Sequence, residues 1–401
     1  MNPGGPSDNG QLTPPPPPSA APEEPVLSPE AKKRKARNKK IIRAAQIVFS
    51  LGIVVGIFFG VLPKIADFSQ VWKTLTQLTP QELGSLILVT VLNIITYWPQ
   101  MMAAMPGLTF WQAGVNNQSS TTIANTLPLG GALATGVSYT MFRSWGFTNN
   151  AIVLEVLITG VWNTFIKLAM PIVALLALAV TGEASATLVV PTIIGVAVLF
   201  VAVGLFALML RSKEMARRIG EYVGRVVSVF RRLFRKPTLH WGPAAVRFRR
   251  QTIELVARRW IPLTVATVVS HAGLYLVLLM SLRHVGISEQ EVSWAQVLGV
   301  FAFVRLISAL PITPGGVGLV ELGYIGALIV LGRDTADVPK DVFEAQVTAA
   351  VLLFRVLTYG AQIPIGLVTY IVWRRKKSWR KPVPREPDPD EAGDLAAAPT
   401  G

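Results

Sequence analysis

The chain has no cysteine, only three histidines and few charged residues, and each shortage removes a class of function. Without cysteine there is no disulfide framework, no thiolate metal ligand and no thiol nucleophile. His240, His271 and His284 are scattered and do not have the spacing of a metal site. The sequence also lacks a nucleotide P-loop and a Gly-x-Ser-x-Gly nucleophile motif. We therefore expect no cofactor, no metal and no enzymatic activity.

Hydrophobic residues are abundant, and they are grouped in long runs. They make up 51% of the 401 residues, and the mean hydropathy is +0.47. Runs of about 20 apolar residues can cross the hydrocarbon core as helices. The net charge of +15 comes from basic clusters that flank these runs, a positive-inside pattern that requires no nucleic acid. The sequence therefore predicts an all-α polytopic integral membrane protein.

The two ends of the chain differ in composition from the middle. Residues 1–31 are rich in proline and are expected to be a disordered cytoplasmic tail, and residues 379–401 a second disordered tail. Residues 32–378 form the expected transmembrane domain. About six full spans are predicted in it. They are the stretches 41–62, 83–105, 150–180, 186–210, 261–283 and 345–373.

The stretch 211–260 is strongly basic and is placed in the cytoplasm. Within it, apolar and arginine side chains alternate at helical spacing, which predicts a basic amphipathic helix. Such a helix either lies on an anionic membrane surface or folds under the bundle as a cytosolic helix. The loop and the N-terminal tail are also candidate contacts for a cytosolic or membrane partner.

Two further apolar segments, 107–140 and 294–332, are interrupted by helix-breaking residues. The second contains two prolines and three glycines between Arg305 and Glu321, and the first contains the run 125–131. Irregular backbone at membrane depth is tolerated only where protein or a wet cavity surrounds it. If both termini are cytoplasmic, the number of membrane crossings before and after each segment (its parity) requires the two broken hairpins to enter from opposite faces. An inverted repeat has this arrangement. Parity leaves open whether each is re-entrant or a pair of full spans.

Ionisable residues beside the second break are candidates for a lipid site. Each costs about 2.5–3.5 kcal/mol at the centre of a span. Arg305 matches a lipid phosphate if it faces a cavity, and Arg355 either completes a basic pair with it or snorkels. Glu321 either forms a structural ion pair with Arg305 or acts on substrate, by positioning or releasing Arg305 or by contacting a cationic headgroup. Lys167 is a further candidate at mid-span. The remaining candidates are break residues, namely Asn125, Pro128, Gly130 and Gly131 in the first hairpin and Pro314, Gly315, Gly316 and Gly318 in the second.

The pattern Arg-x5-Pro-x2-Pro-Gly-Gly-Val-Gly-x2-Glu over 305–321 resembles the flippase-like transmembrane domain of bacterial lysylphosphatidylglycerol synthetases. The run Asn125-Thr-Leu-Pro-Leu-Gly-Gly131 resembles that family's first break, and Arg355 lies where its final helix often carries arginine. The likeness covers about 41–375 of the chain. It implies a translocation module without the soluble transferase domain, and it leaves the lipid unidentified.

The leading hypothesis is a flippase-like protein that moves an anionic or phosphate-linked lipid across a bacterial cytoplasmic membrane. Its partners would be membrane lipids. One alternative is a subunit or enzyme of polyprenyl-phosphate-linked glycan assembly. Another is a non-catalytic membrane scaffold that recruits partners through its tail or basic loop.

Overall fold

The computed structural model describes residues 68–127, 130–183, 186–233, 242–308, 313 and 316–382. All of them belong to one compact unit, Val48–Gly401. The expected tail at 1–31, the expected span at 41–62 and nearly all of the expected tail at 379–401 lie outside the described residues.

Every regular element in these ranges is a helix, as the sequence predicts. The first half contains α3 (Phe68–Thr76), α4 (Pro80–Ala104), α5 (Phe110–Thr126), α6 (Gly130–Ser144), α7 (Asn149–Val180), α8 (Ala186–Arg211) and α9 (Lys213–Leu233). The second half contains α10 (Gly242–His284), α11 (Trp294–Ile307), α12 (Leu319–Gly332), α13 (Lys340–Arg355), the π-helix η3 (Val356–Gly360), α14 (Gln362–Arg375) and the short 3-10 helix η4 (Lys377–Trp379).

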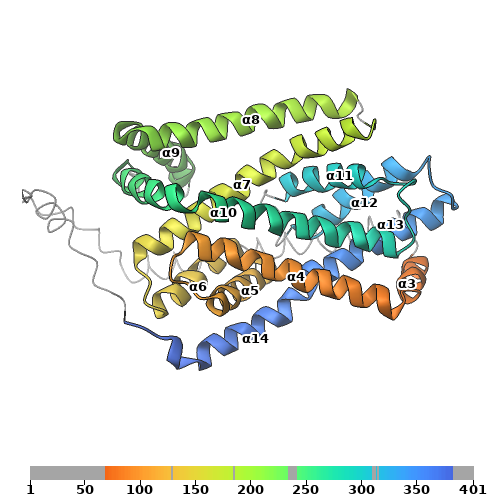
Figure 1. The fold of residues 1–401 in the computed structure, drawn as a ribbon, viewed down its shortest axis with the longest axis horizontal. Coiled ribbons are helices and arrows are strands. Elements are labelled where there is room, and N and C mark those ends of the chain that lie inside the picture. Colours follow the sequence, from red (N-terminus) through yellow and green to blue (C-terminus); the bar gives the residue numbers. More distant parts are fainter. Residues whose placement is uncertain are drawn as a thin grey trace, which may run out of the picture. The chain divides into compact units, whose positions relative to one another are not determined.

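Four of the described helical segments are long and apolar enough to cross a membrane: Pro80–Ala104, Asn149–Val180, Phe248–His284 and Lys340–Arg375. They run roughly alongside one another (Figure 1). Many large apolar side chains on them point away from the protein, for example Leu88, Val173 and Val265, which are all more than half exposed. A soluble protein rarely exposes so much apolar surface, so these faces suit lipid. The chain is a multi-pass membrane protein.

The expected loop 211–260 is largely helical. Its first part forms α9, and residues 242–260 are the beginning of α10, which continues without a break into the expected span 261–283. The helix continues because its early residues already pack on the bundle. Leu255 is buried in one apolar cluster with Ile158, Trp162 and Leu263. The span therefore begins earlier than the basic residues alone suggest.

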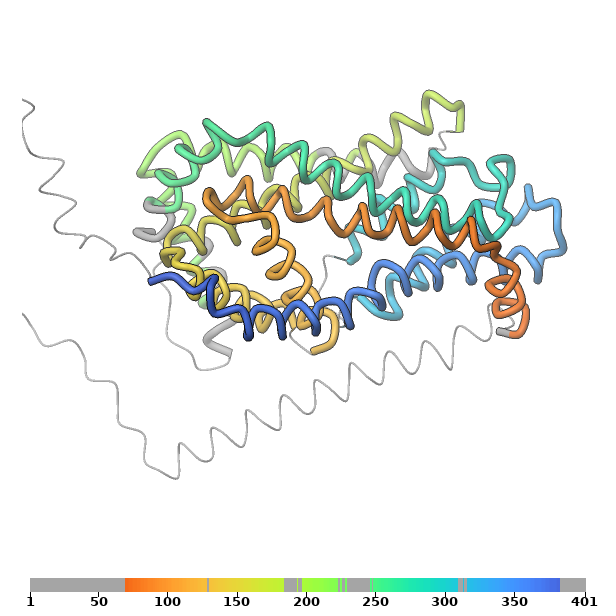
Figure 2. Tube along the Cα trace, turned by 60° about the horizontal axis from the view of Figure 1, so that its bottom comes forward, coloured from red at the N-terminus to blue at the C-terminus, as the bar shows by residue number. Residues whose placement is uncertain are grey.

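The two broken segments form helical hairpins, α5–α6 and α11–α12, close to the expected limits. Figures 1 and 2 both place α5–α6 at the end of the bundle where α14 finishes, and α11–α12 at the end where α13 begins. The hairpins therefore enter from opposite ends. Each follows a long helix, α4 or α10, and precedes another, α7 or α13. This repeated order of elements with opposite direction is what an inverted repeat requires.

The first arms of both hairpins begin in the same way. At α5, the Thr109 hydroxyl accepts from the backbone N–H of Gln112, and the Gln112 side chain accepts from the Thr109 N–H. Ser293 and Gln296 make the same reciprocal pair at α11. Such a capping box satisfies two backbone donors that a helix start leaves unpaired. The pattern Ser/Thr-x-x-Gln thus fixes where each hairpin starts.

Polar side chains hold the long helices together. Asn93 of α4 donates to the Ser270 carbonyl of α10 at 3.0 Å, and Trp162 of α7 donates to Thr264 of α10 at 3.0 Å. Contacts of this kind replace the hydrophobic driving force that is missing between helices in lipid.

Candidate functional site

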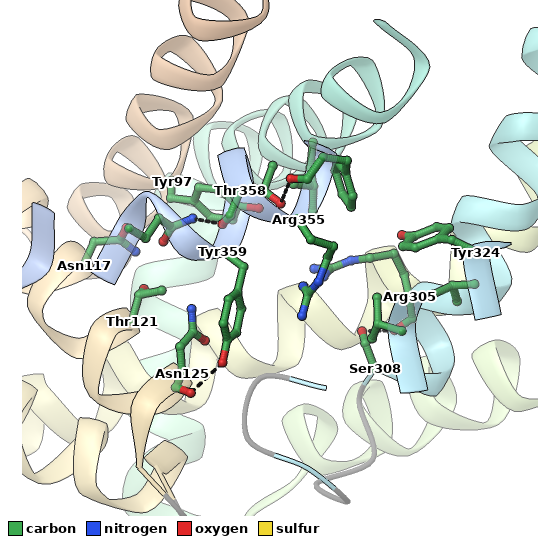
Figure 3. A pocket seen from close by; sticks show the side chains of 15 residues that line it. Tyr97, Asn117, Thr121, Asn125, Arg305, Ser308, Tyr324, Arg355, Thr358 and Tyr359 are labelled. Atoms are coloured by element: carbon green, nitrogen blue, oxygen red, sulfur yellow. Dashed lines mark hydrogen bonds between the residues drawn. The ribbon is translucent and has the colours of Figure 1, made fainter. Parts of the chain in front are cut away.

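A cavity of about 230 Å³ lies where the ends of α5 and α11 approach the π-helix η3. A water molecule occupies about 30 Å³ in the liquid, so the cavity has room for a small headgroup. Figure 3 shows polar side chains from several elements directed into it. The lining residues are Tyr97, Asn117, Thr121, Asn125, Leu274, Val304, Arg305, Ser308, Val320, Tyr324, Phe354, Arg355, Thr358, Tyr359 and Gln362.

The first hairpin turns beside this cavity because of a proline and a glycine. Leu127 precedes Pro128, and its backbone is extended (φ −111°, ψ 140°), as expected for a residue before proline. Gly130 is buried at the start of α6, and a Cβ built there would lie 2.3 Å from the Ala124 carbonyl oxygen. Only glycine allows so close an approach of the two arms. Gly131, in contrast, is exposed and has open space around it.

The second hairpin resumes its helix at two glycines with left-handed backbone. Gly316 has φ 71° and Gly318 has φ 88°, conformations that other residues rarely adopt. Gly318 is the N-cap of α12, and neither glycine lines the cavity. Their role is therefore to shape the turn. The candidates Pro128, Pro314 and Gly315 lie outside the described residues.

Arg305 stands near the end of α11 and lines the cavity. Its Nε atom is buried and has no hydrogen-bond partner among the described residues. Within the same part of the chain, no carboxylate lies within ion-pair distance of its guanidinium. Arg305 is half-buried, and a partly shielded cation without a carboxylate partner favours an anion as ligand.

Arg355, the last residue of α13, lines the same cavity. Figure 3 shows the side chains of Arg305 and Arg355 extending toward a common space. Of the two interpretations open from the sequence, the basic pair agrees with the structure and snorkelling to the surface does not.

Glu321 pairs with Arg355, so the ion pair with Arg305, one of two interpretations open from the sequence, is not formed. Its Oε1 accepts from Arg355 Nε at 2.6 Å, and its Oε2 accepts from the Gly318 N–H at 2.6 Å. The reason is its place in the first turn of α12, where the carboxylate must reach back to cap the helix. Since α12 packs on α13, the second oxygen then faces Arg355. Glu321 is buried and does not line the cavity.

Tyr359 joins this ion pair to the first hairpin. The Arg355 guanidinium lies over its ring, 4.5 Å from the centroid, a cation–π contact. The Tyr359 hydroxyl donates to the Asn125 carbonyl at 2.6 Å, at the end of α5. Thus a chain of contacts runs from Asn125 through Tyr359 and Arg355 to Glu321, and it connects the tips of both hairpins.

The π-helix places Arg355 and Tyr359 at the cavity. Across it, the Ala361 N–H bonds to the Val356 carbonyl at 2.8 Å, one residue further back than in an α-helix. Pro364 follows in the first turn of α14, where its missing N–H is least costly. Such π-helical insertions within α-helices often occur at functional sites.

One face of α5 supplies the opposite wall. Asn117, Thr121 and Asn125 are four residues apart, so they lie above one another on one helix face, and all three line the cavity. The other side of α5 packs closely on α14. There Thr122 donates to the Gln362 carbonyl at 2.8 Å, and a Cβ on Gly366 would meet the Thr122 hydroxyl.

Lys167 is half-buried in α7 and does not line the cavity. Its charge and that of Arg305 are close enough to repel, and His271 of α10 lies within reach of both. Lys167 is therefore not part of the cavity wall.

Several lining residues were not among the sequence-based candidates. Asn117 and Thr121 had a signal, because they belong to a polar stretch that a lipid-facing helix would not hold. Tyr97, Tyr324, Tyr359 and Gln362 had none, since tyrosine and glutamine are common at membrane interfaces and at helix contacts. Their placement depends on how the helices pack.

The match to a known family covers most of this architecture. The model of the lysylphosphatidylglycerol synthase TM region matches residues 47–366, which include both hairpins and the residues lining the cavity. A comparison with curated proteins found no match. The residues that the structure describes include no separate soluble domain. Because the matched region spans well over half of its length, the chain belongs to the lysylphosphatidylglycerol synthase TM region family.

Proposed function

We propose that this protein binds the phosphate of an anionic lipid between Arg305 and Arg355 and moves that lipid across the membrane. The observation that carries the proposal is Arg305, a cation that faces the cavity without a carboxylate partner in the described part of the chain. The guanidinium of Arg355 beside it is paired with Glu321, so it adds hydrogen-bond donors to the site and little net charge. Two arginines in this arrangement match the oxygens of one phosphate.

The surroundings of Arg355 fit the same role. Its Nε is engaged by Glu321 and its flat face by Tyr359. These contacts fix the side chain before any lipid arrives, so less rotamer entropy is lost on binding. Arg305 would contribute attraction, and Arg355 an ordered wall on which the phosphate is held.

The opposed hairpins support movement of the lipid as well as binding. The cavity lies between the tips of α5–α6 and α11–α12, which enter from opposite ends of the bundle. Small displacements of either hairpin would open the cavity toward one side of the membrane at a time. No bond is made or broken, so we propose a transporter and not an enzyme. The basic segments favour cytoplasmic termini, and we propose a bacterial cytoplasmic membrane as the site of action.

A headgroup-exposure assay on reconstituted vesicles tests this function. Wild type, Arg305→Ala and the control Arg333→Ala are compared with short-chain labelled phosphatidylglycerol. Arg333 is exposed beside Asp334 and lies away from the cavity. We expect Arg305→Ala to slow translocation at least about tenfold, because a charge-assisted hydrogen bond is worth about 1.5–3 kcal/mol.

The translocation rate of Arg305→Lys should lie between those of wild type and Arg305→Ala. Lysine keeps the positive charge but cannot donate the two parallel hydrogen bonds of a guanidinium. Equal translocation by wild type and a folded Arg305→Ala variant would refute the site.

A further inference from the structure

The wall opposite the arginines indicates which headgroup the cavity takes. We propose that the lipid is a phosphodiester whose headgroup is an uncharged polyol, such as glycerol or inositol, and that an aminoacylated, cationic headgroup is disfavoured. This inference rests on the proposed function, because it adds a headgroup to the phosphate that Arg305 and Arg355 hold.

The first observation is the composition of the α5 face. Asn117, Thr121 and Asn125 present two amides and a hydroxyl at successive helical turns. Among the described residues, no hydrogen bond engages the Thr121 hydroxyl or the Asn125 side chain. Asn117 uses its Oδ1 to accept from Gln118, which leaves its amide hydrogens available. Amides and hydroxyls of this kind both donate and accept, as neighbouring hydroxyls of a polyol require.

The second observation is the absence of negative charge. No lining residue of the cavity is a carboxylate in the described part of the chain. Glu321 is buried, and its two carboxylate oxygens already accept hydrogen bonds from Arg355 and from the Gly318 N–H. The undescribed stretches of the two breaks contain no aspartate or glutamate in sequence. An ammonium group placed here would meet the uncompensated charge of Arg305 and no carboxylate on the cavity wall, which is unfavourable.

The third observation is the division of the cavity. In Figure 3, Asn117, Thr121 and Asn125 lie on one side and Arg305 lies on the other, with Tyr359 and Arg355 between them. A phosphate at the arginines would therefore direct its headgroup toward α5. The first hairpin would form hydrogen bonds to the headgroup, and the second would bind the phosphate through Arg305. A lipid with a polyol headgroup would therefore contact both hairpins.

Binding of soluble short-chain lipids to the purified full chain tests the proposal. The probes are dioctanoyl phosphatidylglycerol, phosphatidylpropanol, lysylphosphatidylglycerol, phosphatidylcholine and free glycerol 3-phosphate. Phosphatidylpropanol has the same charge as phosphatidylglycerol and no headgroup hydroxyl. The variants are Thr121→Val combined with Asn125→Leu, and the control Thr135→Val. Thr135 is exposed on α6 and does not line the cavity.

We expect wild type to bind phosphatidylglycerol at least about fivefold more tightly than phosphatidylpropanol, because each neutral hydrogen bond contributes about two- to tenfold. The Thr121/Asn125 double variant should lose this preference and keep its affinity for phosphatidylpropanol. The Thr135→Val control should keep both. Lysylphosphatidylglycerol should bind more weakly than phosphatidylglycerol.

Other outcomes contradict the proposal separately from the function. If phosphatidylglycerol and phosphatidylpropanol bind equally to wild type, and Arg305→Ala loses both, the polyol inference fails and the phosphate site stands. Tighter binding of lysylphosphatidylglycerol would also overturn the inference. If free glycerol 3-phosphate binds as tightly as the lipid, the ligand is a soluble phosphate. If neither anionic lipid binds better than phosphatidylcholine, the proposed function itself fails.

Discussion

A single residue, Glu321, connects α12 with α13. Its carboxylate caps the start of α12 and forms an ion pair with Arg355 at the end of α13. Its side chain is 3% exposed and that of Arg355 is 14% exposed, so the pair is shielded from water. Removing one member of such a pair leaves the other buried without a counter-charge. The sequence identified both residues and offered an Arg305–Glu321 ion pair as one of two interpretations, but it did not suggest the pair with Arg355. Sequence spacing alone could not show that α12 and α13 face one another there.

A double-mutant cycle tests this assignment. We expect Glu321→Gln to lower the free energy of unfolding by about 3 kcal/mol, because Arg355 loses its counter-charge while the amide still caps Gly318. Arg355→Gln should lower the free energy of unfolding less in the Glu321→Gln background than in wild type, so the two effects are not additive. Thermal unfolding in detergent gives the values.

The exposed pair Arg333–Asp334 is the matched control, and Asp334→Asn should change stability by less than about 1 kcal/mol. Additive effects at Glu321 and Arg355 would contradict the pairing.

The two hairpins are the elements that the sequence predicted best. Prolines and glycines marked both breaks, whereas the capping residues Thr109 and Ser293 at the two starts were found in the structure and were not predicted. The π-helix was not predicted, although it carries Tyr359 and positions Arg355. Gly360 and the nearby Pro364 weaken a helix there, but they do not by themselves distinguish a π-helix from a simple kink. The π-helix exists because α13 and α14 must each pack on a different hairpin.

Neighbouring glycines of the first hairpin give a matched test of its turn. Gly130→Ala should lower the free energy of unfolding by about 1–3 kcal/mol, because its Cβ would clash with backbone oxygens of Ala124 and Ile123. Gly131→Ala should cause no loss, since space is open and alanine favours a helix. Thermal unfolding of both variants gives the comparison. Equal effects would mean that the arms do not approach as closely as described.

At the scale of the whole molecule, the cavity lies between the hairpins α5–α6 and α11–α12, which enter the bundle from opposite ends. The sequence predicted this arrangement by parity, on the assumption that the basic clusters lie in the cytoplasm. It could not predict the composition of the cavity, since Tyr97, Tyr324 and Gln362 come from three separate helices. Long spans are encoded locally by hydropathy, whereas a site between helices depends on packing that no local pattern records.

The lack of native cysteine makes the topology easy to test. Asp334→Cys lies in an exposed loop before α13, and Ser378→Cys is exposed after α14. The helical segment between them, Lys340–Arg375, has 36 residues, so it spans about 54 Å and exceeds a bilayer core of about 30 Å. A membrane-impermeant thiol reagent should label Asp334→Cys from outside intact cells and Ser378→Cys only after lysis. Labelling of both from one side would contradict the opposed hairpins.

The central claim is that a lipid phosphate is held between Arg305 and Arg355, and native mass spectrometry of the purified protein tests it most directly. Wild type and the Arg333→Ala control should each retain one phospholipid of anionic headgroup after mild delipidation. Arg305→Ala and Arg355→Ala should both lose it, since each removes one guanidinium from the phosphate. Equal retention of anionic lipid by all four proteins would contradict the account.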